Sequence, residues 1–232
     1  MPTRALPLAL AWGAIFMSGC QQAEAPPSTR STATAAALRS TATPVSTPTP
    51  APALTLEKVG AAASPSGFIA FAVVDNPSRE SALDVRVEIA SVDSAGQALA
   101  RRSGTIRMVG PGQRGAVALA FPVGRSLPAN FTGSISGAQW SADASPEIAQ
   151  VDQASFLQDA RTPSVRVRIV NHGHGADRVV LTAVCWDAAG NIRGGGVRTV
   201  MVGPQTAGSE VTIQVAIATV PTRCDAFGVS TT

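Results

Sequence analysis

The chain has 232 residues, of which 45% are hydrophobic and only 14% are charged, a length that suits one large domain or two small ones. Eighteen basic and fifteen acidic residues leave a formal charge of +3, and no basic run is longer than Arg101-Arg102. This weak positive balance argues against a dedicated nucleic-acid binder, and two histidines and three cysteines offer little material for a His-rich metal site.

Residues 1–19 have the features of a secretory signal. A positive charge precedes the apolar or small residues 5–17, a stretch too short for a membrane-spanning helix, which needs about 20 residues. The sequence Met17-Ser18-Gly19-Cys20 resembles the bacterial lipobox, which implies cleavage before Cys20 and lipid attachment to it. Gln21 resembles the next residue of outer-membrane lipoproteins, so we expect a lipid anchor in the outer membrane, facing the periplasm. An ordinary secretory signal with an incidental cysteine is the alternative.

Residues 20–53 are expected to form a disordered tether. Of the thirty-three residues from 21 to 53, twenty-six are Ala, Thr, Pro or Ser, with no apolar periodicity. Such a segment has too little hydrophobic area to offset the entropy of ordering it. Its Pro-rich end favours extended polyproline II, and fully extended the tether would reach roughly 100 Å. Low-complexity sequence without a spacing role is the alternative.

Residues 54–142 and 146–232 carry the same series of segments in the same order, which predicts an internal repeat. Turns recur every 8–12 residues without helical periodicity, so each copy is predicted to be an antiparallel β-sandwich. One continuous sandwich built from both halves is the alternative. The paired segments are residues 68–74 and 165–170, 83–89 and 179–186, 93–96 and 187–190, 108–111 and 201–204, and 117–123 and 211–217.

Two of these segments make sharper local predictions. Apolar and charged residues alternate strictly over residues 83–89, as in a strand with one buried face. Asp93 and Asp187 each begin an Asp-x-x-Gly quartet, in which the Asp caps the turn and the Gly supplies a positive φ. Each quartet is therefore predicted to be a hairpin turn.

The order of the segments resembles the small Ig-like modules called FxLYD domains. The resemblance covers about residues 67–123 and 165–217, with the Asp of the naming motif at Asp93 and Asp187 and Trp186 in place of its Tyr. It implies an all-β chain of two tandem Ig-like β-sandwich domains, of a kind found in secreted and lipid-anchored bacterial proteins and without known enzymatic activity.

The remaining cysteines are expected to pair. With Cys20 assigned to lipid, Cys185 and Cys224 are left in an oxidising compartment, and alternation turns Cys185 toward the interior. We expect a disulfide between Cys185 and Cys224, with two separate thiols as the alternative. The first copy has no cysteine at the corresponding positions, near Ser91 and Ala129.

Candidate chemical groups are few. His172 and His174 follow a strand and, with Asp177, could share a metal ion. Zinc requires three or four ligands, so a polar, Gly-rich turn is the stronger interpretation, and we expect no metal and no cofactor. Residues 194–196 are three glycines without a following helix, which predicts a flexible or bulged segment rather than a phosphate loop. No nucleophile motif accompanies the histidines, so we expect no catalytic residues and no enzyme.

Five arginines are a candidate interaction surface. They fall on two predicted strands and are expected to form basic stripes that contact phosphates of lipopolysaccharide or acidic peptides of the cell wall. Solvated surface without a partner is the alternative. The five residues are Arg101, Arg102, Arg107, Arg166 and Arg168.

These features together predict a non-enzymatic cell-envelope lipoprotein, a structural or protein-interaction module that a flexible tether holds off the membrane. Its expected partners are the membrane, through the N-terminal lipid, and an envelope protein, but not nucleic acid. The alternative is an accessory or solute-binding subunit of an envelope transport or secretion complex. A concave pocket between the copies would favour the solute binder, and a flat apolar or edge-strand patch would favour the interaction module.

Overall fold

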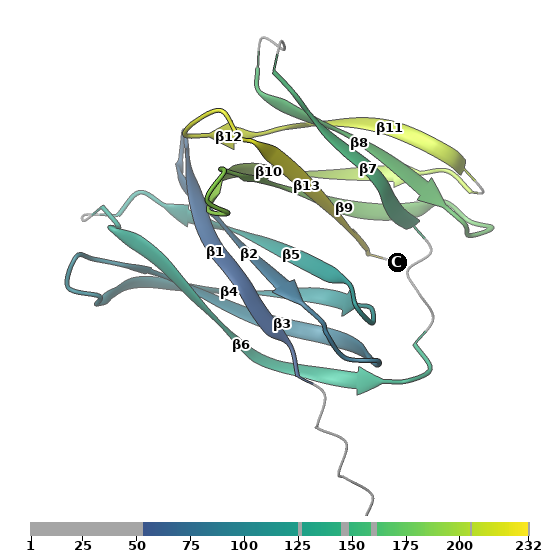
Figure 1. Ribbon diagram of the computed structural model, residues 1–232, viewed down its shortest axis with the longest axis horizontal. Helices are drawn as coiled ribbons and strands as arrows, with labels where there is room; N and C mark the ends of the chain where they lie inside the picture. The colour runs from purple at the N-terminus through teal and green to yellow at the C-terminus, as the bar shows by residue number, and fades with distance from the viewer. Residues whose placement is uncertain (1–52, 125–126, 145–148, 159–161, 205, 232) are drawn as a thin grey trace, which may run out of the picture. The chain divides into compact units, whose positions relative to one another are not determined.

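The computed structural model describes residues 53–124, 127–144, 149–158, 162–204 and 206–231. Over these residues the protein is all-β, as predicted, and contains no helix. The predicted signal and nearly all of the predicted tether, including Cys20, lie outside the described residues. The strands (Figure 1) are β1 (Thr55–Ser64), β2 (Gly67–Asp75), β3 (Ser81–Val92), β4 (Ala98–Val109), β5 (Arg114–Pro122), β6 (Asn130–Ser141), β7 (Ala149–Leu157), β8 (Ser164–Asn171), β9 (Asp177–Trp186), β10 (Ile192–Val202), β11 (Thr206–Gln214), β12 (Ala216–Ile217) and β13 (Arg223–Ser230).

The strands form four antiparallel sheets with the orders β1-β2-β5, β4-β3-β6, β11-β8-β7 and β12-β10-β9-β13. The first two sheets come from the first half of the described chain, and the last two come from the second half. Read in chain order, β7, β8 and β11 occupy the places of β1, β2 and β5. In the same way β9, β10 and β13 occupy the places of β3, β4 and β6. The halves therefore share one strand order, to which the second adds the short strand β12.

Each half has its own hydrophobic core between its two sheets. In the first half, alternate residues of β2 and β3 meet, because each strand points every second side chain inward. The second core contains the equivalent faces of β8 and β9 and the two cysteines. Among the fully buried core residues are Ala70, Ala72, Val85, Val87 and Ile89 in the first half, and Val165, Val167, Ile169, Leu181 and Ala183 in the second.

A third cluster joins the two halves through the outer faces of two sheets. β2 and β9 are buried on both faces, since their remaining side chains pack against each other and not against solvent. The resulting order of layers is β4-β3-β6, β1-β2-β5, β12-β10-β9-β13 and β11-β8-β7 (Figure 1). The described residues thus form one compact unit.

The two predicted hairpin turns are present and have the same hydrogen bonds. The Oδ1 atom of Asp93 accepts from the N–H groups of Ala95 and Gln97 at 2.9 and 2.8 Å. Asp187 accepts from the equivalent groups, of Ala189 and Asn191, at the same two distances. The glycines that complete the turns, at positions 96 and 190, have φ of 79° and 74°, a region that disfavours other residues.

A buried asparagine fixes the opposite end of each sandwich. The Nδ2 group of Asn76 donates to the carbonyl oxygens of Glu80, Val109 and Gly110, at 2.8, 2.8 and 3.1 Å. Asn171 occupies the same place in the second half, where Nδ2 donates to three carbonyl oxygens and Oδ1 accepts from Gly173 N–H. These side chains satisfy buried carbonyl groups that would otherwise lose their hydrogen bonds with water.

Candidate functional site

The contact between the two sandwiches, here called the seam, is the most elaborate side-chain arrangement in the described chain. Its centre is apolar, with Phe71 and Val73 of β2 against Val184 and Trp186 of β9, all essentially inaccessible to solvent. The other members are Ala62 of β1, Ile69 of β2, Ala116 and Ala118 of β5, Ile192 of β10, Ala216 of β12 and Phe227 of β13.

Two glycines permit the seam to close. A Cβ atom at Gly60 of β1 would lie 2.6 Å from the Cβ of Ile192 in the other half. At Gly195 of β10 it would lie 2.8 Å from the ring of Phe71 and collide with the carbonyl oxygen of Ala183. The glycine run at residues 194–196 is therefore a place of close backbone approach. It also adjoins an irregularity in the β9–β10 register, as the predicted bulged segment requires.

Arg114 of β5 ties the seam together at its polar margin. Its guanidinium contacts both carboxylate oxygens of Glu57 in its own half, at 2.6 and 3.0 Å, and Asp225 of β13 in the other half at 3.1 Å. Partial burial tends to lower the pKa of Arg114, but the hydrogen bond and attraction from Glu57, and then those from Asp225, raise it above its ordinary value. The guanidinium therefore stays charged and joins two halves through a fork that lysine cannot reproduce.

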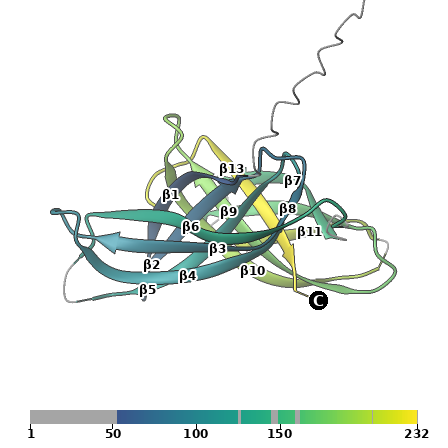
Figure 2. The same ribbon diagram turned by 90° about the horizontal axis from the view of Figure 1, so that it is seen from below.

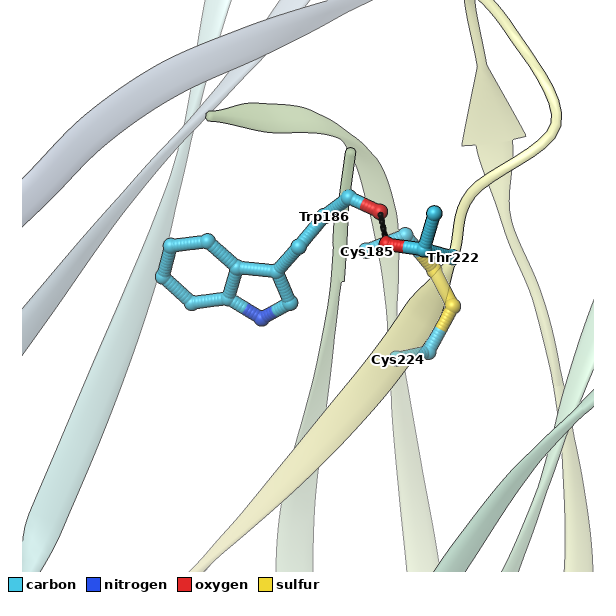
Figure 3. The surroundings of a disulfide bond; sticks show 4 residues. All are labelled: Cys185, Trp186, Thr222 and Cys224. Atoms are coloured by element: carbon cyan, nitrogen blue, oxygen red, sulfur yellow. Dashed lines mark hydrogen bonds between the residues drawn. A yellow bond between two sulfur atoms is a disulfide. The ribbon is translucent and has the colours of Figure 1, made fainter. Parts of the chain in front are cut away.

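Trp186 lies between two arginines. The guanidinium carbon of Arg114 is 5.5 Å from the ring centroid, and that of Arg223 is 5.2 Å away, both within the range of cation–π attraction. Figure 3 shows the indole pointing to the opposite side of the strand from the disulfide, while its backbone carbonyl accepts from the hydroxyl of Thr222 at 3.1 Å. The indole Nε1 is buried without a hydrogen-bond partner among the described residues.

An open groove, here called the seam groove, runs beside the seam where the halves diverge. It encloses about 520 Å³, within the roughly 300–1,000 Å³ typical of small-ligand sites. One wall lies on the β9–β10 face, with the buried Thr182, the half-buried Val180 and the exposed Val197, and the other consists mainly of residues of β4 and β5. Arg107 crosses its end and donates to the backbone oxygen of Ser230 at 3.4 Å.

The predicted disulfide between Cys185 and Cys224 is confirmed. The two residues are direct partners on β9 and β13, with Cα atoms 4.1 Å apart, and both belong to the second core. The bond thus links neighbouring strands of one sheet (Figure 3). In the first half, the strand register places Phe131, two residues beyond Ala129, opposite Ser91, and no cysteine lies at these positions. Phe131 packs against Phe68 and Phe121, and this aromatic cluster lies in the place of the disulfide.

The five candidate arginines lie on two different sheets. Arg101, Arg102 and Arg107 are on β4, and Arg166 and Arg168 are on β8. These strands belong to the first and the fourth layer, so the structure does not bring the two groups together.

Acidic neighbours balance much of this positive charge. Arg101 is 2.7 Å from Glu88, Arg168 is 3.4 Å from Asp152, and Arg166 is 3.9 Å from Glu210. All three pairs are exposed, where a single pair contributes roughly 0–1 kcal/mol. Alternation also separates Arg102 from Arg101 and Arg107, which share the other face of β4. Contact with phosphates or acidic peptides stays a prediction.

The histidine loop follows β8. Its Gly173 N–H is held by Asn171, in agreement with a structured polar turn. Among the described residues no three His, Cys, Asp or Glu side chains are grouped as metal ligands would be.

No helix in the described part of the chain is long and apolar enough to cross a membrane. No family model and no curated protein matches the chain, so the FxLYD-like resemblance also stays a prediction.

Proposed function

We propose that the protein is a non-enzymatic lipoprotein of the cell envelope, whose folded part is a rigid protein-interaction module on a flexible tether. The seam is the observation that carries the proposal of rigidity. Two sandwiches that merely followed each other along a chain would present surfaces of changing orientation. Here an apolar contact, two close glycine approaches and the Arg114 fork hold both halves as one body.

A rigid body on a tether is suited to recognition because its loops and strand edges keep fixed relative positions. A preorganised surface loses less conformational entropy on binding, so the free energy of binding is not reduced by the cost of ordering the module. The lipid anchor rests on Met17-Ser18-Gly19-Cys20, and the tether on the Ala, Thr, Pro and Ser content that follows. Placement in the outer membrane, facing the periplasm, rests on Gln21.

The test compares the full chain with Cys20→Ala and Gly195→Ala in bacterial cells. We expect labelled palmitate in the parent and in Gly195→Ala, but none in Cys20→Ala, which loses the acceptor thiol. Chemical crosslinking in intact cells should yield one recurrent envelope protein with the parent and less of it with Gly195→Ala, which disturbs the seam. Absence of label from the parent would contradict the anchor, and equal partner yield from both chains would contradict a rigid interaction module.

The seam groove favours a second candidate, a solute-binding subunit of an envelope transport or secretion complex. Its volume suits a small molecule, and its walls combine apolar side chains with Arg107. The variant Val197→Trp separates the two candidates, because it narrows the seam groove without touching the centre of the seam. If the protein is an interaction module, crosslinking should yield the same partner from this variant as from the parent. If it is a solute binder, a small molecule that copurifies with the parent should be lost from this variant.

A further inference from the structure

The edge strands of the four sheets differ in how they are protected against pairing with another strand. An unprotected edge offers a row of free N–H and C=O groups, and natural proteins cover it or place charges, prolines, bulges or very short strands there. Seven of the eight edge strands in the described part of the chain carry at least one charged residue or are only two residues long. These are β1 with Glu57 and Lys58, β4 with Arg101, Arg102 and Arg107, β5 with Arg114 and Pro122, β7 with Asp152, β11 with Glu210, β13 with Arg223 and Asp225, and β12 with only two residues.

β6 is different. Its twelve residues, Asn130–Ser141, include no Asp, Glu, Lys, Arg or Pro. It is the terminal strand of β4-β3-β6, one of the two outer sheets, which faces the viewer in Figure 2. One edge of β6 pairs with β3, and no described strand pairs with its other edge.

The first part of β6 has the regular geometry that strand pairing requires. Residues 130–135 pair without interruption with β3, and the register shifts only beyond Ile135. On the inner face, Gly133 lies against Val59 and Leu56 of β1, so the core holds the strand in place. On the outer face, Thr132 and Ser134 are exposed. Six regular residues match the usual length of a strand.

From this edge we infer that the protein forms a two-fold symmetric dimer in which β6 pairs antiparallel with β6 of a second copy. In such a pair, residues near the axis meet their own copies, so a charged edge would oppose like charges. No register of β6 against itself can do so, because the strand has no charge. The two outer sheets would then join as one continuous sheet of six strands, β4-β3-β6-β6-β3-β4, within the usual range.

The first test is a cysteine scan of the full chain in intact cells, with Thr132→Cys and Ser134→Cys on β6. Ser103→Cys is the matched control, because it is exposed on the opposite edge strand of the same sheet. We expect oxidation to give a disulfide-linked dimer at least tenfold more abundant for a β6 position than for Ser103→Cys or the parent. Equal yields at all positions, or linkage of β6 to a different protein, would overturn the dimer.

The second test uses charge. Ser134→Lys should shift the purified full chain from dimer to monomer in light scattering, and Ser134→Glu should do the same, while Ser103→Lys should remain dimeric. Mixing the Lys and Glu variants should restore a dimer, since opposite charges then meet across the axis. Tryptophan fluorescence during urea unfolding reports folding of each variant, since Trp140 lies on β6 itself. A dimer unaffected by both substitutions, or a monomeric parent, would refute the pairing, and either result would leave the palmitate and partner tests unchanged.

Discussion

At the scale of single residues, short-range and long-range hydrogen bonds differ in how well a sequence reveals them. The turns at Asp93 and Asp187 satisfy their own backbone within four residues, so the Asp-x-x-Gly pattern was enough to predict them. Asn76 instead contacts Val109, thirty-three positions away, and nothing near it in the sequence indicates that partner. Its role was therefore missed, although the repeat of an asparagine at Asn171 was a usable signal.

The turn at Asp187 leads to a prediction about pH. Hydrogen bonds from the Asn191 backbone and then from Arg193 lower the pKa of this carboxyl from 3.8 to about 2. A carboxyl with a lowered pKa contributes stability above its unfolded pKa and loses it as pH falls through the folded value. Asp187→Asn should therefore lower the free energy of unfolding at pH 6, and its difference from the parent should close between about pH 4 and pH 2. Urea titrations across this pH range measure the difference in the free energy of unfolding between the parent and the variant. A difference that does not change with pH would contradict the prediction.

At the scale of strands, hydrophobic pattern reports how many faces are buried. Residues 83–89 alternate, and over this part of β3 one face is buried, whereas residues 68–74 are uninterruptedly apolar and lie in β2, which is buried on both faces. The second half reverses the order, since β8 alternates and β9 is almost continuously apolar. In each half, the continuously apolar strand therefore belongs to the sheet that lies in the seam. The sequence analysis identified the strands but not this contact, because alternation alone does not name the partner of a second buried face.

The disulfide between β9 and β13 leads to a prediction about stability. It joins residues 39 positions apart, and in the chain-entropy model such a loop contributes about 4 kcal/mol by restricting the unfolded chain. Replacing Cys185 and Cys224 together with Ala should lower the free energy of unfolding by about that amount. Urea denaturation of the parent, with and without reductant, gives the comparison. If the reduced parent and the double variant both matched the oxidised parent, the bond would have no stabilising role.

At the scale of the whole molecule, the seam makes the two halves dependent on each other. Gly195→Ala should lower the free energy of unfolding by about 1–3 kcal/mol, because the added Cβ meets Phe71 and the Ala183 carbonyl. Gly175→Ala is the matched control, since a Cβ there meets no atom within 4 Å, and it should change stability by less than about 0.5 kcal/mol. Tryptophan fluorescence during urea unfolding reports both variants. Equal midpoints for the two would show that the seam contributes little.

The seam joins two sheets that do not correspond to each other in the repeat, and this bears on whether further sandwiches could be added to the stack. The first half contributes its β1-β2-β5 sheet, and the second contributes the sheet that corresponds to β4-β3-β6 in the first. Head-to-tail contacts of this kind, repeated from chain to chain, build a ring where the rotation closes and a filament where it does not. The faces left at the two ends bear charged residues, Arg86 and Glu88 on β3 and Arg166 and Arg168 on β8. In stacked repeat proteins, polar outer faces of this kind cap the terminal units.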